Sequence, residues 1–383
     1  MRHLLPLMPK PSRYTGIEEG AVHKQLHNLE LHCALAFPDT YEVGMSYLGQ
    51  KILYDIMNAN PLWWAERVMA PCREAAAVLR EHQQPLCTLE SDTPLAHVHC
   101  LGFSVTHELC YTNILYMLDL AGIPLYSSQR SADGDSLLAW PIVMAGGGAT
   151  LSAEPLAPFM DLMVLGEGEE SMPDIARLLV KARAAGWPRS QFLHEARHIA
   201  GVYVPSLFAA QANGSVSPLL DDYPQAMRRV VSNLDAADYP VQQVVPIGAV
   251  HNRLSLEIAR GCTRGCRFCH AGMVYRPVRE RSLGSLHGLL EECLAHTGFD
   301  EVSFLSLSTG DFSALKTLFT STMDRCSREQ ISVSLPSLRV GSIDDSIMER
   351  MSTIRRTGAT LAPEAGSQRL RDVINKGITE DEL

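Results

Sequence analysis

Three cysteines, Cys262, Cys266 and Cys269, lie in the short segment GCTRGCRFCH that runs from Gly261 to His270. The Cys-x3-Cys-x2-Cys spacing allows three thiolates to ligate three irons of a four-iron, four-sulfur (4Fe-4S) cluster. A cluster that only stores electrons normally has four cysteine ligands, so here one iron is left for a ligand from outside the protein. The spacing therefore predicts a metal centre whose open iron takes part in chemistry.

Zinc is the alternative metal for this segment, and it would need a fourth ligand, for which His270 is the nearest candidate. The chain has no second Cys-x2-Cys pair to complete such a site. A separate motif, His194-Glu195-Ala-Arg-His198, would place two imidazoles one helical turn apart, with Glu195 as the general base of a zinc metalloprotease. No further histidine or glutamate follows until His251. A zinc metalloprotease is therefore an alternative function, but the sequence offers no third zinc ligand near this motif.

The cysteine segment, with Phe268 before the third cysteine, resembles the signature of radical S-adenosylmethionine (SAM) enzymes. In that family the amino and carboxylate groups of SAM bind the open iron. One electron from the cluster then cleaves SAM into methionine and a 5′-deoxyadenosyl radical. The resemblance implies a 4Fe-4S cluster, SAM, and a low-potential electron donor such as flavodoxin or ferredoxin. The substrate is left open, as is the choice among methylation, methylthiolation, rearrangement and oxidation.

The resemblance also implies a set of SAM contacts, which are Phe268 beside the adenine and Ser308, Gly310, Ser337, Arg339 and Glu364 after later strands. Ser308 and Gly310 stand where the family often has Gly-Gly-Glu, and Glu364 resembles the family's Glu-Ser-Gly type of turn. Asp311, which follows Gly310, is expected to be the N-cap of the next helix.

Residues 1–210 alternate short apolar runs with segments of helical periodicity. Parallel strands are predicted over Leu31–Phe37, His97–Val105, Ile142–Ala145 and Leu162–Leu165. Helices are predicted between them, over Tyr47–Met57, Ile114–Leu120 and Met172–Val180. The alternation predicts an α/β domain with a doubly wound sheet.

Residues 211–246 are rich in turn residues and are predicted to be a connector. From residue 247 to 383, strands are predicted over Leu254–Ala259, Val302–Leu307, Ile331–Leu335 and Ala359–Ala362, each followed by a helical segment. These would be the first four units of a radical SAM β/α barrel. Four units leave an exposed sheet edge. We therefore expect a truncated chain or a second chain that completes the barrel. The alternative function is a cluster-binding incomplete subunit or an inactive fragment that needs a partner chain.

The N-terminal region resembles the cobalamin-binding-like domain of one uncharacterised radical SAM subgroup. The matching segments are Pro11–Tyr14, Pro38–Met45, Glu108–Asn113 and Gly166–Glu169, and Tyr275–Arg279 near the cysteines also matches. Cobalamin domains often carry Asp-x-His-x-x-Gly, and here Asp39–Gly44 has Tyr41 at the histidine position. A phenol with a pKa of about 10 is a poor neutral ligand for cobalt. Cobalamin is therefore expected either to bind without a protein axial ligand or not to bind.

The chain has 383 residues and a net charge of -10, which gives no support to nucleic-acid binding through the overall field. Arginines are nevertheless dense near the cysteines, at Arg260, Arg264, Arg267, Arg276, Arg279 and Arg281. They could bind an anion or could compensate the charge of a thiolate cluster. No segment predicts a membrane span or an export signal, and the ten cysteines then imply a reducing cytoplasm.

Overall fold

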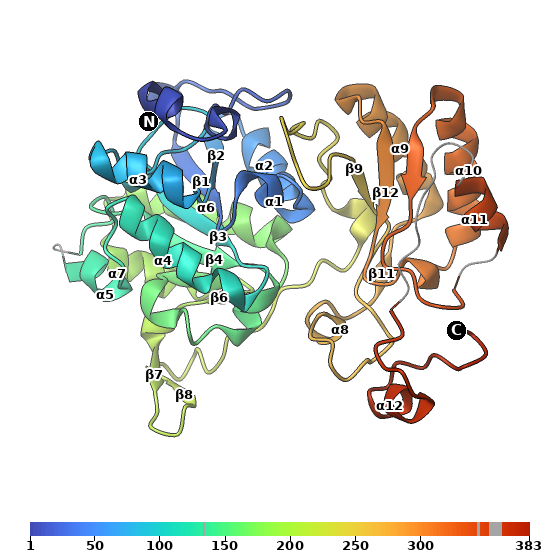
Figure 1. The fold of residues 1–383 in the computed structure, drawn as a ribbon. Coiled ribbons are helices and arrows are strands. Elements are labelled where there is room, and N and C mark those ends of the chain that lie inside the picture. Colours follow the sequence, from blue (N-terminus) through green and yellow to red (C-terminus); the bar gives the residue numbers. More distant parts are fainter. Residues whose placement is uncertain (133–134, 343–344, 352–361) are drawn as a thin grey trace. The chain divides into compact units, whose positions relative to one another are not determined.

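The computed structural model describes residues 1–132, 135–342, 345–351 and 362–383, which form two compact units (Figure 1). Unit one comprises Met1–Val231 and Val244–His251, and unit two comprises Ser232–Gln243 and Asn252–Leu383. The residues predicted to be a connector are thus divided between the two units. No helix within the described part of the chain is long and apolar enough to cross a membrane.

Unit one contains a six-stranded sheet in the order β2-β1-β3-β4-β5-β6. The strands are β1 (Leu31–Phe37), β2 (Trp63–Met69), β3 (Cys100–Ser104), β4 (Ile142–Gly146), β5 (Leu162–Val164) and β6 (Val202–Tyr203). The first five are parallel and β6 pairs antiparallel with β5. A small hairpin of β7 (Phe208–Ala210) and β8 (Val216–Pro218) follows. The α/β fold with a doubly wound sheet is confirmed.

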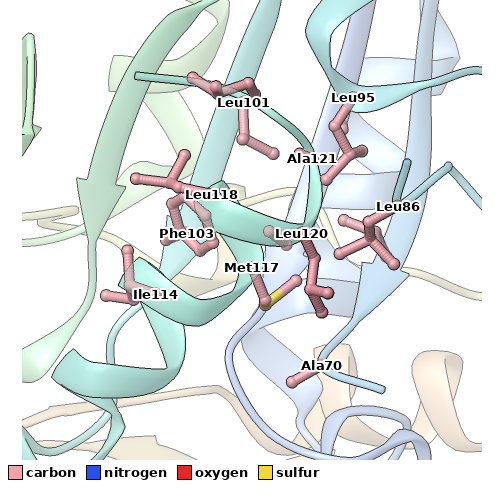
Figure 2. Close-up of a cluster of buried hydrophobic side chains, with 14 of the residues drawn as sticks. Ala70, Leu86, Leu95, Leu101, Phe103, Ile114, Met117, Leu118, Leu120 and Ala121 are labelled. Atoms are coloured by element: carbon pink, nitrogen blue, oxygen red, sulfur yellow. The ribbon is translucent and has the colours of Figure 1, made fainter. Parts of the chain in front are cut away.

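Helices cover both faces of this sheet, because successive side chains of a strand point to opposite faces. The helices are α1 (Tyr41–Gly44), α2 (Leu48–Ala59), α3 (Arg73–Glu81), α4 (Tyr111–Leu120), α5 (Ser127–Ala132), α6 (Gly168–Ala184) and α7 (Arg189–Ala196). Ala34 and Ala36 of β1 belong to a hydrophobic cluster with α3 and α4. The β1 residues Leu31, Cys33 and Leu35 belong to a second cluster with α2 and α6. Figure 2 shows the first cluster, in which α4 packs Ile114, Met117 and Leu118 near Leu101 and Phe103 of β3.

Strand β2 is buried along its whole length although its centre is charged, and this is why no strand was predicted there. Arg67 Nη2 donates to Glu18 Oε2 at 2.8 Å, and Arg67 Nε donates to Glu90 Oε1 at 2.6 Å. The neighbouring Glu66 pairs with His32 of β1. Buried charges are tolerated when they are paired and hydrogen-bonded, so tertiary partners make this a core strand.

Unit two contains a parallel three-stranded sheet in the order β13-β12-β9. Its strands are β9 (Leu254–Glu257), β12 (Glu301–Leu305) and β13 (Ser332–Ser334), and a separate antiparallel pair joins β10 (Ala259–Arg260) to β11 (Arg279–Glu280). The helices are α8 (Ala271–Val274), α9 (Leu283–Thr297), α10 (Leu315–Cys326), α11 (Asp345–Met351) and α12 (Gln368–Val373). The first three predicted β/α units are therefore present. The strand predicted over Ala359–Ala362 lies, except for Ala362, outside the described residues.

The N-cap expected at Asp311 is wrong. Helix α10 begins four residues later at Leu315, after Ala314, and Asp311 lies in the 3-10 turn Thr309–Asp311. Its carboxylate pairs with Arg264 of the cysteine segment instead. The sequence pattern correctly suggested that the Asp311 carboxylate accepts hydrogen bonds. Its partner Arg264 lies 47 residues away, so local spacing could not identify it.

Candidate functional site

The cysteine segment is a loop closed at its base by the pairing of β10 with β11. Ala259 lies opposite Glu280 and Arg260 opposite Arg279. Gly261, the first loop residue, has φ +94°, and a Cβ there would lie 2.6 Å from the carbonyl oxygens of Tyr275 and Pro277. Only glycine accommodates both this backbone conformation and this close approach. The loop therefore leaves the sheet in a fixed direction just before Cys262.

The three cysteines of the loop are free thiols and are partly exposed, whereas six of the other seven cysteines are buried. The Arg264 amide lies 3.5 Å from Cys262 Sγ, and the Cys269 amide donates to the Cys266 carbonyl at 3.0 Å. In the part of the chain that the structure describes, no three His, Cys, Asp or Glu side chains are grouped closely enough to hold a metal ion. Three accessible thiols on one short loop are a suitable donor set for an iron–sulfur cluster. Their assignment as ligands stays a prediction.

Ser308, one of the SAM contacts predicted after β12, is linked to the cysteine loop by way of Asp311. Ser308 Oγ donates to Asp311 Oδ2 at 2.7 Å, and Arg264 Nε donates to the same oxygen at 2.7 Å. The hydrogen bonds from Arg264 lower the pKa of the Asp311 carboxyl, so it is ionised near neutral pH. Ser308 is thus joined to the loop between the first two cysteines.

Gly310 packs against the turn that contains Arg339. A Cβ at Gly310 would overlap the Ser342 side chain, whose Oγ donates to the Arg339 carbonyl at 2.6 Å. Ser337, in the same segment, has φ +59°, which is uncommon for a residue with a side chain. This backbone follows the end of β13, where the sequence predicted SAM contacts.

A segment that the sequence reasoning missed, Ile374–Gly377, follows α12 and contacts the cysteine loop. Asn375 Nδ2 donates to the Gly265 carbonyl at 2.9 Å. Lys376 Nζ lies 3.1 Å from Glu364 Oε1 and 5.8 Å from the centre of the Phe268 ring. Arg339 donates to the carbonyls of Lys376 and Gly377. The structure therefore brings Phe268, Arg339 and Glu364 to one place. The sequence did contain a sign of this turn, because Asn and Gly favour the left-handed backbone conformation. Asn375 adopts it with φ +54° and Gly377 with φ +60°.

The six arginines near the cysteines all contact protein groups. Arg260 binds Glu257 through two hydrogen bonds, at 3.1 and 2.9 Å, and Arg281 is buried over the Tyr239 ring. Arg264 pairs with Asp311, whereas the remaining three donate to backbone carbonyls of Val373, Gly272 and Pro277. These contacts favour a structural role for the arginines over an open anion site.

In unit one, Tyr41 is buried and is not directed at a ligand. Its hydroxyl donates to Glu18 Oε1 at 2.7 Å and accepts from the Ile247 amide at 3.2 Å. Burial raises the pKa of the Tyr41 phenol well above its ordinary value, so the phenolate that could bind a metal is disfavoured. The position that is histidine in many cobalamin domains is therefore used here for packing.

The His-Glu-x-x-His motif does not form the helical arrangement that a zinc protease needs. Helix α7 ends at Ala196, so His198 lies beyond it. The His194 ring instead contacts Arg197, with 2.8 Å between Nδ1 and Nη1. Two imidazoles on one helical face would be required to bind zinc. The metalloprotease interpretation therefore finds no support in the geometry.

Comparisons with known proteins bear on both units. Residues 49–205 match the family described as "Radical SAM proteins, N-terminal". The uncharacterized protein MJ0966 of Methanocaldococcus jannaschii is 30% identical over 244 residues, which is 63% of this chain and 47% of that protein. The chain thus spans about half the length of this curated relative.

Two solved structures have a similar fold. OxsB, a cobalamin-dependent SAM radical enzyme solved with aqua-cobalamin and SAM bound, matches with a TM-score of 0.56 and 14% identity, over 92% of this chain and 46% of OxsB. TsrM of Kitasatospora setae, a radical SAM methyltransferase solved with tryptophan and a SAM analog, matches with a TM-score of 0.51 and 14% identity, over 89% of this chain and 60% of TsrM.

At 14% identity, these two matches show the fold alone. The match to the radical SAM family covers sequence of unit one, a region separate from the cysteine signature, so two parts of the chain give the same assignment. The resemblance inferred from the cysteine segment is confirmed by the match of residues 49–205 to the N-terminal region of radical SAM proteins, and the fold of the chain is similar to those of OxsB and TsrM.

Proposed function

We propose that this chain is a radical SAM enzyme in which Cys262, Cys266 and Cys269 hold a 4Fe-4S cluster. When bound, the cluster would supply one electron for reductive cleavage of SAM, which yields methionine and a 5′-deoxyadenosyl radical. The observation that carries the proposal is the free, partly exposed cysteine triad on a loop fixed by β10, β11 and Gly261. Its support from outside the loop is the family match of unit one.

Several side chains around the loop suit a role in binding SAM. Phe268 is 54% exposed and offers an aromatic face to a purine. Glu364, with its carboxylate beside Lys376, could accept hydrogen bonds from an amino or hydroxyl group of SAM. Ser308 and Arg339 are already hydrogen-bonded within the protein, so we assign them to shaping the site rather than to first contact with SAM.

Cobalamin binding by unit one is a finer proposal, which rests on the fold shared with OxsB and TsrM. Because the Tyr41 hydroxyl is buried and donates to Glu18, we propose that Tyr41 would not hold cobalamin through its cobalt if unit one bound this cofactor. Retention of cobalamin would favour methylation among the reactions left open. A low-potential donor such as flavodoxin or ferredoxin would supply the electron.

The test is anaerobic reconstitution of the full chain with iron and sulfide, followed by reduction with dithionite in the presence of SAM and an assay for 5′-deoxyadenosine. We expect about four irons per chain, the content of a 4Fe-4S cluster. The Cys266→Ala variant should lose both the cluster and the product. Cys72→Ala, which removes a partly exposed thiol of unit one, is the matched control and should retain both.

Three outcomes of this assay are distinct. 5′-Deoxyadenosine that depends on the triad supports the radical SAM enzyme. A cluster without SAM cleavage supports the alternative, a cluster-binding subunit that needs a partner chain for activity. Binding of zinc in place of iron would contradict the proposal.

A further inference from the structure

We propose that Asn375 and Lys376 are positioning residues for the cysteine loop and for the aromatic side chain beside it. They belong to the clasp segment, which we define as Ile374–Gly377. The inference rests on the proposed function, since it concerns how the loop is prepared for a cluster and SAM. It adds two residues that the cysteine signature does not contain.

The Asn375 side chain holds the turn between the first two cysteines. Its Nδ2 donates to the carbonyl oxygens of Gly265 at 2.9 Å and Arg264 at 3.4 Å, across 110 and 111 residues of sequence. A Cβ at Gly265 would lie 3.4 Å from this nitrogen. The amide therefore packs directly on the turn, and its two donors satisfy carbonyls that the short loop cannot pair by itself.

The backbone of the clasp segment holds the other interval of the loop, between the second and third cysteines. The Arg267 amide donates to the Ile374 carbonyl at 3.0 Å, and the Arg267 guanidinium donates to the Val373 carbonyl. Both intervals between cysteines are thus bound to the last residue of α12 and the residues that follow it. A loop fixed at two points has fewer conformations available to the backbone that carries its thiols.

Lys376 connects the loop to two other candidate SAM residues. Its ammonium lies 5.8 Å from the centre of the Phe268 ring and 3.1 Å from Glu364 Oε1, and its side chain is only 16% exposed. An ammonium over an aromatic face and beside a carboxylate restrains both groups. Lys376 therefore sets the orientation of Phe268 relative to Glu364.

Loss of the Asn375 side chain is predicted to alter the properties of a bound cluster as well as the stability of the loop. The Arg264 amide faces Cys262 Sγ at 3.5 Å, and the carbonyl of this same residue accepts from Asn375. Hydrogen bonds to cluster sulfurs help to set the reduction potential. Loss of the Asn375 amide should release the Arg264–Gly265 peptide, which directly follows the peptide whose N–H faces Cys262, and so change the spectroscopic properties of a reduced cluster.

The first experiment compares Asn375→Gly with Gln330→Gly in the reconstituted full chain. Glycine retains the φ of +54° at position 375 and removes only the amide. Gln330 is a matched control, since it also has positive φ, at +58°, and its side-chain amide donates to a backbone carbonyl, that of Ser327 at 3.1 Å. Iron content, the electron paramagnetic resonance spectrum of the reduced cluster with and without SAM, and the rate of 5′-deoxyadenosine formation are measured.

We expect Asn375→Gly to shift the spectrum of the reduced cluster and to slow SAM cleavage by about three- to tenfold, the order of one lost hydrogen bond. Gln330→Gly should match the unaltered chain. Equal spectra and rates for Asn375→Gly and Gln330→Gly would overturn the role of Asn375. If Asn375→Gly is unfolded by circular dichroism, Asn375→Asp, which keeps the shape of the side chain, takes its place.

The second experiment compares Lys376→Gln with Lys376→Arg. The glutamine variant should raise the KM for SAM several-fold with unchanged iron content, and arginine should restore most of the affinity because it keeps the positive charge. Equal KM values for both variants and the unaltered chain would contradict the role of Lys376. An unaltered chain that forms no cluster overturns the proposed function and this inference together. SAM cleavage that is insensitive to both residues overturns only this inference.

Discussion

At the scale of single residues, His99 is a histidine that the fold keeps neutral. Its Nδ1 accepts a hydrogen bond from the His32 amide at 3.0 Å, which requires this nitrogen to be unprotonated. Burial lowers the pKa of His99 to about 3, with additional lowering by Arg183 and His32. The imidazole is therefore a backbone acceptor and contributes to stability only in its neutral form.

This pKa predicts how stability changes with pH. The unfolded chain protonates His99 below its ordinary pKa of about 6.5, whereas the folded chain does so only near 3. The contribution of His99 to the free energy of unfolding is thus complete above pH 6.5 and is lost progressively as the pH falls toward 3. His99→Asn, which retains an acceptor that does not titrate, should reduce the loss of stability between pH 7.5 and pH 5.

Urea unfolding of both proteins at the two pH values measures this difference. The variant is compared with the unaltered chain at each pH, so groups that titrate in both proteins cancel. Identical changes in the free energy of unfolding would show that His99 accepts a proton in the folded state as readily as in the unfolded one.

At the scale of elements, the loop that carries the cysteines depends on one glycine at its base. Gly261→Ala would require a non-glycine residue at φ +94° with its Cβ 2.6 Å from two carbonyl oxygens. We expect this variant to fold but to incorporate less than half the iron of the unaltered chain, because β10 and β11 must separate to admit the methyl group.

Gly284→Ala is the control for the effect of a methyl group alone. Gly284 lies in α9, and a Cβ there would meet nothing within 4 Å. Alanine in a helix is favoured over glycine by about 0.5–1 kcal/mol, so stability should rise slightly and iron content should stay the same. Iron assay and thermal unfolding of the two variants provide the comparison, and equal iron content in both would contradict the role of Gly261.

The same elements show what the sequence could and could not predict. Strand β1 has the predicted bounds because Leu31–Phe37 is apolar except for His32. Strand β2 could not be predicted, since Glu66 and Arg67 are buried only by virtue of partners such as Glu18 and Glu90. The helices α9 and α10 were predicted from their apolar periodicity, and the inward-facing Leu286, Leu290, Leu318 and Phe319 are buried.

The site divides in a similar way. The cysteine triad is a local pattern, so eight residues of sequence are enough to identify it. The contacts of Asn375 with Gly265 and of Arg264 with Asp311 join residues 110 and 47 positions apart. Neither residue type nor spacing encodes such a pairing in one sequence, because it depends on the path of the chain through several helices and strands.

At the scale of the whole molecule, the two units should respond separately to the loss of a buried charge. Asp161, in unit one, is fully buried with Arg130 and Arg189, and Arg189 Nη2 donates to Asp161 Oδ2 at 2.6 Å. Asp161→Ala leaves two buried cations without their carboxylate and should cost about 3–5 kcal/mol. The surface pair Arg80–Asp119, in which both side chains are more than half exposed, is the comparison, and Asp119→Ala should cost less than about 1 kcal/mol.

Hydrogen exchange measured by mass spectrometry locates the effect. In Asp161→Ala, exchange should accelerate in β4 and β5, where the Val143 amide donates to Asp161 at 2.7 Å. Exchange in β9, β12 and β13 should stay close to that of the unaltered chain, because these strands belong to the other compact unit. Equal acceleration in both sheets would mean that the chain unfolds as a single cooperative body.

The division of the chain into units also has a consequence for how its gene can be rearranged. The path enters unit two at Ser232, returns to unit one at Val244 and leaves it again after His251. Leu234 accepts a hydrogen bond from Arg281, and the Val245 amide donates to Glu19, so each of the short stretches is bonded within its own unit. A single recombination point anywhere in this region would give each product a stretch that is foreign to the unit on which it packs. The two units are therefore expected to be inherited as a pair, and exchange of one of them for an unrelated domain would require several coordinated crossovers.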